Sequence, residues 1–186
     1  MSNFLLKDPD CVFIHIPKTG GLSIRKGVWK GNYDGPVFGY IPEEWQHLFS
    51  FAFVRHPLQR LVSAYNMFTS IANGDSEMTI ESFLDIVTDE SIIFDERRKT
   101  LEERIRHHTI PQTHPFNCLD KAQVVGRQEC FDSDFSVITE GFGVDRIAPK
   151  LNMTSGIHWS LILDKVSKDR ATEYYREDFK LLGYLI

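Results

Sequence analysis

A lysine and two glycines follow one apolar run of the sequence, in the stretch FIHIPKTGGLS from Phe13 to Ser23. Glycines let backbone N–H groups approach an anion closely, and Lys18 adds a full positive charge. A helix that begins after Gly21 would add the partial positive charge of its N-terminus. Thr19 and Ser23 add hydroxyl donors. The stretch predicts a loop that binds a phosphate-like anion, and the plainer alternative is a tight turn with a solvated lysine.

A second cationic residue, Arg55, follows the apolar run LFSFAFV. Ligands of open α/β sheets bind at the carboxyl ends of the strands, where an arginine can contact a phosphate through two parallel hydrogen bonds. Ser63 lies eight residues further on and can add another hydrogen bond. Arg60 is predicted to form a structural ion pair or to lie on the surface. The second stretch therefore predicts a second anion contact.

Short apolar runs that end at Gly, Pro or charged residues predict buried strands over 11–16, 48–54 and 122–126. The period of residues 135–139 fits a strand or the start of a helix. Apolar spacings of three and four predict helices over 57–72, 79–89 and 169–184, with Thr79 as a cap and Gly183 as a stop. Strands that alternate with helices predict the α/β class, with a mainly parallel sheet flanked by helices.

Composition limits the remaining classes. The chain of 186 residues, 42% of them hydrophobic, predicts one domain over residues 1–186. A net charge of -5 gives no general basic field, so we expect no nucleic-acid partner. Three cysteines without a CxxC pair favour a reducing cytoplasm, and no apolar segment is long enough for a membrane anchor. The histidines suggest no metal site, because His107 and His108 are adjacent and cannot share a helical face.

The two stretches together resemble the PAPS-dependent sulfotransferases, in the carbohydrate-type branch that includes heparan sulfate 2-O-sulfotransferase. In that family a PKTGG-S loop holds the 5′-phosphosulfate of the donor, 3′-phosphoadenosine-5′-phosphosulfate (PAPS), and an R-x-P-x-x-R-x-x-S-x-Y segment holds its 3′-phosphate. The matching positions of the loop are Lys18, Thr19, Gly20, Gly21 and Ser23, with Leu22 between them, and those of the segment are Arg55, Pro57, Arg60, Ser63 and Tyr65. The resemblance implies a P-loop-like sulfotransferase fold and an enzyme that uses PAPS without a metal.

Weaker similarities cover most of the remaining chain. They lie in IPQTHPF (110–116), VVGRQECFDSDF (124–135), APKLNMTSG (148–156) and the closing helix. They imply that Gly126 and Arg127 lie near the adenosine, and Lys150 and Asn152 near the 3′-phosphate. Each of these four is otherwise an ordinary strand-end or loop residue.

Sulfuryl transfer depends on positioning and charge stabilisation, as phosphoryl transfer does. Lys18 is the predicted catalytic group that neutralises the leaving oxygen. The acceptor hydroxyl also needs a base, and His47 is the first choice, with Tyr40, Glu43, Glu44 and His114 as alternatives. His15 is expected to satisfy a hydrogen bond within its strand.

The predicted acceptor is a hydroxyl group on a carbohydrate or a related small molecule, whose identity the sequence does not give. Two other classes stay open at this point. A P-loop kinase or NTPase would use the same kind of loop, although its lysine follows the last glycine and Lys18 precedes both. A non-catalytic nucleotide-binding module would keep the donor site without a working base.

Overall fold

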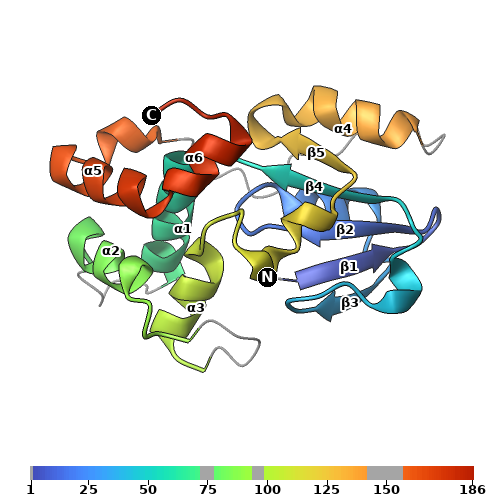
Figure 1. The fold of residues 1–186 in the computed structure, drawn as a ribbon, viewed down its shortest axis with the longest axis horizontal. Helices are drawn as coiled ribbons and strands as arrows, with labels where there is room; N and C mark the ends of the chain where they lie inside the picture. The colour runs from blue at the N-terminus through green and yellow to red at the C-terminus, as the bar shows by residue number, and fades with distance from the viewer. Residues whose placement is uncertain (1, 72–77, 94–98, 142–156) are drawn as a thin grey trace. The chain divides into compact units, whose positions relative to one another are not determined.

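The computed structural model describes residues 2–71, 78–93, 99–141 and 157–186. Within them the chain forms two compact units (Figure 1). The sheet unit comprises Met1–Arg55 and Gln112–Met153, and the helical unit comprises His56–Pro111 and Thr154–Ile186. The expected mixture of strands and helices is confirmed, and the prediction of one domain over residues 1–186 stays a prediction.

The sheet unit contains a five-stranded sheet in the order β3-β1-β2-β4-β5. The strands are β1 (Ser2–Leu6), β2 (Cys11–His15), β3 (Tyr33–Val37), β4 (Ser50–Val54) and β5 (Val124–Arg127). β2 pairs with β4, and β4 with β5, in parallel, whereas β1 is antiparallel to both β2 and β3. The prediction of a mainly parallel sheet was therefore wrong, because the sheet is mixed and only the half that carries β2, β4 and β5 is parallel.

The two antiparallel strands gave little signal in the sequence. β1 has the sequence SNFLL, whose three apolar residues are consecutive and do not alternate with polar ones, and it forms a hairpin with β2 in which Phe4 lies opposite Phe13. β3 has the sequence YDGPV, in which Gly35 and Pro36 both disfavour a strand. Pro is tolerated here because β3 lies at the edge of the sheet.

The two faces of the sheet bury different side chains. One face packs Phe13, Phe51 and Phe53 against the π-helix η1 (Ser23–Val28) and the helix α4 (Phe131–Glu140). The other face buries smaller side chains beneath Trp45 of the short helix η2 (Glu43–Trp45) and Leu119 of η4 (Leu119–Lys121). Residues 135–139, which the sequence left between strand and helix, are helical and belong to α4.

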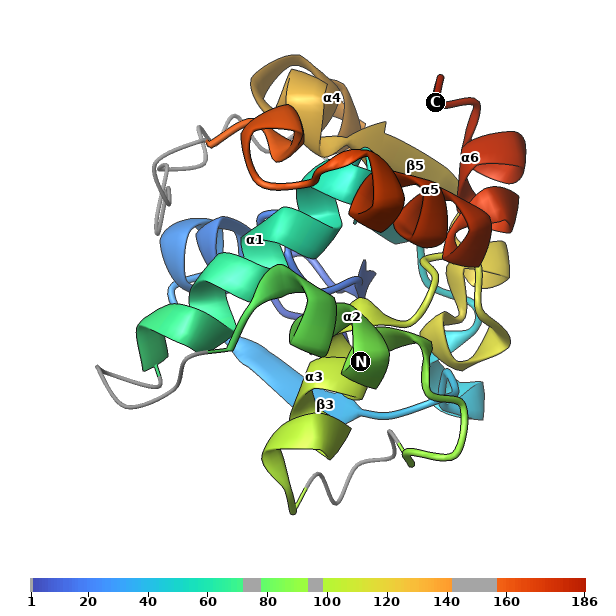
Figure 2. The ribbon, with the colours of Figure 1, turned by 90° about the vertical axis from the view of Figure 1, so that its left-hand side faces the viewer.

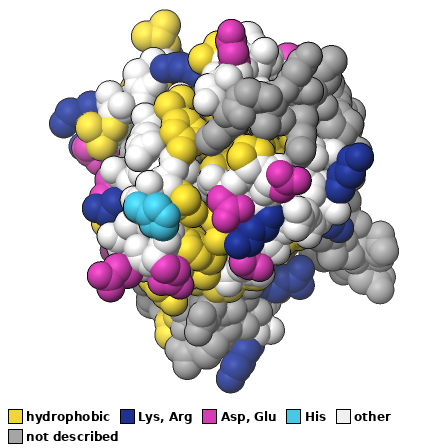
Figure 3. All heavy atoms as spheres, turned by 90° about the vertical axis from the view of Figure 1, so that its right-hand side faces the viewer, with side chains coloured by type: hydrophobic (Ala, Val, Ile, Leu, Met, Phe, Trp, Pro, Cys, Tyr) yellow, Lys and Arg dark blue, Asp and Glu magenta, His cyan; other side chains and the backbone are white. Residues whose placement is uncertain are grey.

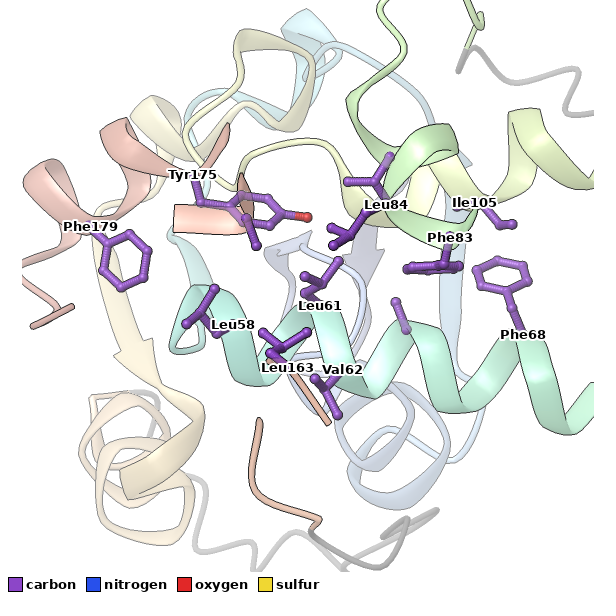
Figure 4. Close-up of a cluster of buried hydrophobic side chains, with 13 residues drawn as sticks. Leu58, Leu61, Val62, Phe68, Phe83, Leu84, Ile105, Leu163, Tyr175 and Phe179 are labelled. Atoms are coloured by element: carbon purple, nitrogen blue, oxygen red, sulfur yellow. The ribbon is translucent and has the colours of Figure 1, made fainter. Parts of the chain in front are cut away.

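In the described part of the helical unit, five α-helices (Figure 2) and the short helix η6 (Trp159–Leu161) pack around one apolar cluster. The α-helices are α1 (Pro57–Ile71), α2 (Ile80–Thr88), α3 (Leu101–Thr109), α5 (Lys165–Tyr174) and α6 (Arg176–Leu182). Figure 4 shows Leu58, Leu61 and Val62 of α1 in this cluster with Phe83 and Leu84 of α2. Among the described residues, no helix has both the length and the apolar character needed to cross a membrane.

The predicted ends of the helices are confirmed where a local signal was present. The Thr79 hydroxyl accepts a hydrogen bond from the Ser82 N–H (3.2 Å) and caps α2. Gly183 ends α6 at a φ of 66°, in the left-handed region that favours glycine. The predicted helix over 169–184 is instead two helices, α5 and α6, which meet at Tyr175.

Arg60 is buried in the helical unit, with 1% of its surface exposed, so the expectation of a surface residue or an ion pair was wrong. Its guanidinium donates to the backbone carbonyl oxygens of His108 (3.0 Å), Thr109 (3.2 Å) and Ile110 (2.6 Å). These carbonyls belong to the C-terminal end of α3, where helices leave acceptors unsatisfied and favour cations. Arg60 therefore joins α1 to α3.

We expect Arg60→Lys to lower the free energy of unfolding by about 2–4 kcal/mol, because an ammonium cannot reproduce the planar set of donors and leaves buried carbonyls unsatisfied. Urea denaturation measures this loss. The control is Arg176→Lys, since Arg176 is exposed and forms an ion pair with Glu173 on the surface. Equal stability of the two variants would contradict the structural role of Arg60.

Candidate functional site

Three cationic residues lie at one edge of the sheet unit. β2, β4 and β5 are parallel, with Ile14 opposite Ala52 and Val54 opposite Arg127, so their carboxyl ends share an edge. Lys18 follows β2, Arg55 follows β4 directly, and Arg127 ends β5. This is the edge at which open α/β sheets bind ligands.

The loop after β2 is held in an unusual backbone conformation. Lys18 has a φ of 72° and Gly20 a φ of 93°, both in the left-handed region. A non-glycine residue in this region costs on the order of 1 kcal/mol, and such residues cluster at ligand-binding sites. The buried Thr19 hydroxyl donates to the Ile16 carbonyl (2.7 Å), and the Ser23 N–H donates to the Gly20 carbonyl (3.0 Å). In this structure the Thr19 hydroxyl shapes the loop, and its role as a donor to the ligand stays a prediction.

Gly21 is required by a close approach of the His15 ring. A Cβ atom at this position would lie 2.2 Å from His15 Cδ2 and 2.3 Å from His15 Nε2, so no larger residue fits without a shift. The His15 ring also lies 5.5 Å from the Phe13 ring, measured between centroids. His15 therefore packs directly on the loop.

The helix after the loop differs from the one expected. Residues Ser23–Val28 form a π-helix of six residues, in which the Trp29 N–H donates to the Ile24 carbonyl at 3.1 Å. So short a helix has little macrodipole, and the partial charge expected at its N-terminus contributes less than the Lys18 ammonium. π-helices occur frequently at functional sites.

Arg55 is held at both its side chain and its backbone. Its guanidinium Nη1 donates to the Lys18 carbonyl oxygen (3.3 Å). Its backbone N–H donates to Oε1 of Gln112 (2.9 Å), and Nε2 of Gln112 donates to the Arg55 carbonyl (2.8 Å). The sequence drew attention to the PQ pair at 111–112 only through the resemblance, and gave Gln112 no role.

The positive charges of Lys18 and Arg55 act on one another. Burial, and secondarily the charge of Arg55, lower the pKa of the Lys18 ammonium from 10.5 to about 8. No carboxylate of the described residues forms an ion pair with Lys18. Lys7, by contrast, pairs with Asp34 (3.0 Å) and Asp10 (3.8 Å). A bound anion would offset the repulsion between the two cations.

One face of the molecule carries side chains of both charges. Figure 3 shows one face of the molecule, on which Lys and Arg side chains are interspersed with Asp and Glu and with hydrophobic side chains. That face carries no continuous basic patch. The closeness of Lys18 to Arg55 is therefore a local feature of the loop, seen in the hydrogen bond from the Arg55 guanidinium to the Lys18 carbonyl.

The other predicted donor residues lie in different surroundings. Leu22 is partly buried and Ser23 is buried where η1 begins, and both belong to the loop. Arg127 is exposed, and its backbone N–H donates to the Asp134 carboxylate (2.7 Å). Ser63 is buried on α1 in the helical unit. Lys150 and Asn152 lie outside the described residues.

The structure does not bring His47 together with Lys18. His47 is exposed in the turn between η2 and the first residue of β4, and the Phe49 carbonyl accepts from Val12 near the start of β2. His47 therefore lies near the residues at which β2 and β4 begin, which is the amino edge of these parallel strands. Ser50 and Arg55 are five residues apart, and an extended strand advances by about 3.3 Å per residue, so Arg55 lies at the opposite edge of the sheet.

The alternative bases are divided between the two edges of the sheet. The Tyr40 carbonyl accepts from the side chain of Asn3, which is paired with Ile14 near the carboxyl end of β2, and the Tyr40 side chain is 60% exposed. His114 follows Gln112 closely, and its Nδ1 accepts from the Phe116 N–H (3.2 Å). Glu43 and Glu44 are exposed on η2, which leads to the amino edge.

Comparison with known proteins adds one family. A family model described as "Sulfotransferase family" matches residues 38–185, which include Arg55, Ser63 and Arg127 but begin after the Lys18 loop. A search of the curated proteins gave no match. A search of the solved structures also gave none.

We expect the Lys18 ammonium to titrate near pH 8 in the free protein. Arg55→Ala should raise this pKa without restoring the ordinary value, because the charge of Arg55 is removed and the burial remains. NMR titration of lysines labelled at Cε measures the pKa of Lys18 in the wild-type and variant proteins. The control is Lys26→Ala, at an exposed position of η1, which should leave the Lys18 pKa unchanged. An unchanged Lys18 pKa in Arg55→Ala would show that the two charges do not interact.

Proposed function

The chain belongs to the sulfotransferase family, and from this premise we propose that it transfers a sulfuryl group from PAPS to a hydroxyl acceptor. The observation that carries the choice of donor is the pair of cations formed by Lys18 and Arg55 at the carboxyl edge of β2 and β4. Such a pair stabilises a ligand with several negative charges. The carbohydrate character of the acceptor rests on the resemblance described above.

The proposal assigns the two anionic ends of the donor to different residues, following the resemblance to the family. In the proposal, Lys18 and the N–H groups from Thr19 to Ser23 hold the 5′ end. Arg55 and Ser63 hold the 3′-phosphate, with Lys150 and Asn152 beside it. Arg127 lies near the adenosine. The contact between the Arg55 guanidinium and the Lys18 carbonyl (3.3 Å) supports this division, because it connects the residue for the distal phosphate to the loop for the reacting group.

When bound, PAPS supplies an activated sulfuryl group whose bond to the 5′-phosphate oxygen breaks as the acceptor oxygen bonds to sulfur. The Lys18 ammonium neutralises the negative charge that develops on that phosphate oxygen, which is the electrostatic form of catalysis. Lys18 is suited to this role at neutral pH, because a pKa of about 8 leaves it mostly charged. The acceptor hydroxyl gives its proton to a base during the same step.

The base belongs, in this proposal, to the carboxyl edge of the sheet, since proton transfer needs a group within hydrogen-bond reach of the acceptor. Tyr40 and His114 are the candidates on that side. The Nδ1 lone pair of His114 is used by the Phe116 N–H. Neutral His114 would therefore carry its proton on Nε2 and have no second lone pair to take the proton of the acceptor, so Tyr40 is the better candidate for the base.

We expect 3′-phosphoadenosine-5′-phosphate (PAP), the spent donor, to raise the melting temperature, with a stabilisation of about 2.7 kcal/mol at a concentration one hundred times the Kd. ATP with magnesium should stabilise the protein less. Thermal unfolding with each nucleotide distinguishes the two. Preferential stabilisation by ATP and magnesium would favour a kinase or NTPase, and no stabilisation by PAP would remove the basis of the proposal.

We expect Lys18→Ala to lower sulfuryl transfer by about 10²–10³-fold, as the loss of one electrostatic contact to the transition state does. Arg55→Ala should act mainly on donor affinity and raise the Kd of PAP. Transfer of labelled sulfate from PAPS to a panel of hydroxyl acceptors measures the first effect, and calorimetry measures the second. Lys26→Ala is the matched control, and binding of PAP without transfer to any acceptor would favour a non-catalytic module.

We expect His47→Ala to retain wild-type turnover, because His47 lies at the amino edge of β4, away from Lys18. A lost general base lowers turnover by about 10²–10⁴-fold, so the two outcomes are well separated. The pH dependence of kcat/KM should also keep its shape in this variant. A loss in that range would restore His47 as the base and contradict its exclusion from the site.

A further inference from the structure

Gln112 is a fully buried polar side chain that exchanges two hydrogen bonds with the backbone of one residue, Arg55. Its exposed fraction is 0%, its Oε1 accepts from the Arg55 N–H (2.9 Å), and its Nε2 donates to the Arg55 carbonyl (2.8 Å). Two residues of neighbouring antiparallel strands exchange hydrogen bonds in the same way. The Gln112 amide therefore acts on Arg55 as a strand neighbour would.

The contact between Gln112 and Arg55 lies where β4 stops pairing with its neighbouring strands. The pairing of β4 with β2 ends at Ala52, and its pairing with β5 ends at Val54. The backbone of Arg55 is thus the first beyond the paired part of the strand. Gln112 orders this backbone at the point that decides where the guanidinium lies, beside the Lys18 carbonyl.

Gln112 is itself held in place. Its backbone carbonyl accepts from the side chain of Asn117 (3.0 Å), and only 1% of Asn117 is exposed. Because both residues are buried, Gln112 has few alternative conformations. A rigid support of this kind keeps a ligand-binding side chain close to the geometry that binding requires.

An amide side chain suits this position for two chemical reasons. One side chain must donate to a carbonyl and accept from an N–H, and an ionised carboxylate cannot donate. A carboxylate would also place a negative charge next to Arg55 and Lys18, where it would compete with an anionic ligand. A neutral amide orders the Arg55 backbone without adding a negative charge beside the two cations.

We propose that Gln112 is a positioning residue of the anion site, which fixes Arg55 beside Lys18 through the backbone of Arg55. The proposal rests on the function proposed above in one respect, namely that Arg55 binds a phosphate of the donor. The placement of Arg55 beside Lys18 is independent of that function and is tested separately.

The first test is a double-mutant cycle on PAP affinity, measured by calorimetry with Gln112→Met, Arg55→Ala and the double variant. Gln112→Met keeps the length of the side chain and removes both hydrogen bonds. We expect it to raise the Kd of PAP about tenfold, the equivalent of one weakened charge-assisted contact, when Arg55 is present. With Arg55→Ala it should change the Kd by less than about twofold, because the residue through which it acts is gone.

Asn3→Leu is the matched control, because Asn3 is a buried amide of the same sheet unit that donates to the Tyr40 carbonyl (2.8 Å). It should lower the melting temperature and leave the Kd of PAP unchanged. A Gln112→Met variant that loses stability in the same way with unchanged affinity would overturn the proposal. So would an equal loss of affinity with and without Arg55.

The second test needs no nucleotide. In Gln112→Met, NMR titration should give a Lys18 pKa that is shifted in the same direction as in Arg55→Ala. The reason is that the Arg55 guanidinium is no longer held beside Lys18. If PAP does not bind the wild-type protein but this shift is found, the proposed function fails and the positioning role stands. A Lys18 titration identical to that of the wild type would overturn the positioning role, whatever PAP does.

Discussion

The repulsion between Lys18 and Arg55 is the constraint on which the site depends. Two cations at adjacent strand ends separate unless the backbone prevents it. Here the parallel pairing of β2 with β4 fixes the distance between the strand ends, and the left-handed conformation at Lys18 and Gly20 folds the loop back. The buried amide of Gln112 holds the remaining free backbone, at Arg55. The sheet unit thus holds two positively charged side chains close together, and the charge of Arg55 helps to lower the pKa of Lys18.

Two arginines five residues apart serve different purposes. Arg55 lies at the end of β4 with its guanidinium at the Lys18 loop, whereas Arg60 is buried and donates to three carbonyls at the end of α3. Both positions match the same family motif. A motif therefore combines residues for a ligand with residues for the fold, and burial and hydrogen-bond partners distinguish them.

The sequence predicted elements whose signal is local. The strands β2 and β4 were visible as apolar runs, and α2 as an apolar stripe with a threonine cap. β1 and β3 were missed because their stability comes from pairing with β2 and with each other, which leaves no periodic pattern. The π-helix was expected as an α-helix, since the two share the same apolar spacing over so few residues.

The candidate site could be predicted only where a residue of suitable chemistry follows a recognisable strand in the sequence. Lys18 and Arg55 follow strands directly, so their common edge follows from parallel pairing. His47 looked plausible because it lies between the two strands in the sequence, but the chain crosses to the other edge before β4 begins. Gln112 gave no signal, because an amide that supports a backbone 57 residues away has no local pattern.

The β3 strand has a consequence for how the protein meets other chains. Pro36 has no N–H to offer, and the φ of 115° at Gly35 bends the strand away from a regular extended form. An exposed sheet edge is a template to which a foreign strand can add, and proline and irregular backbone are common defences against it. The residues that hid β3 from sequence analysis thus make this edge of the sheet a poor seed for aggregation.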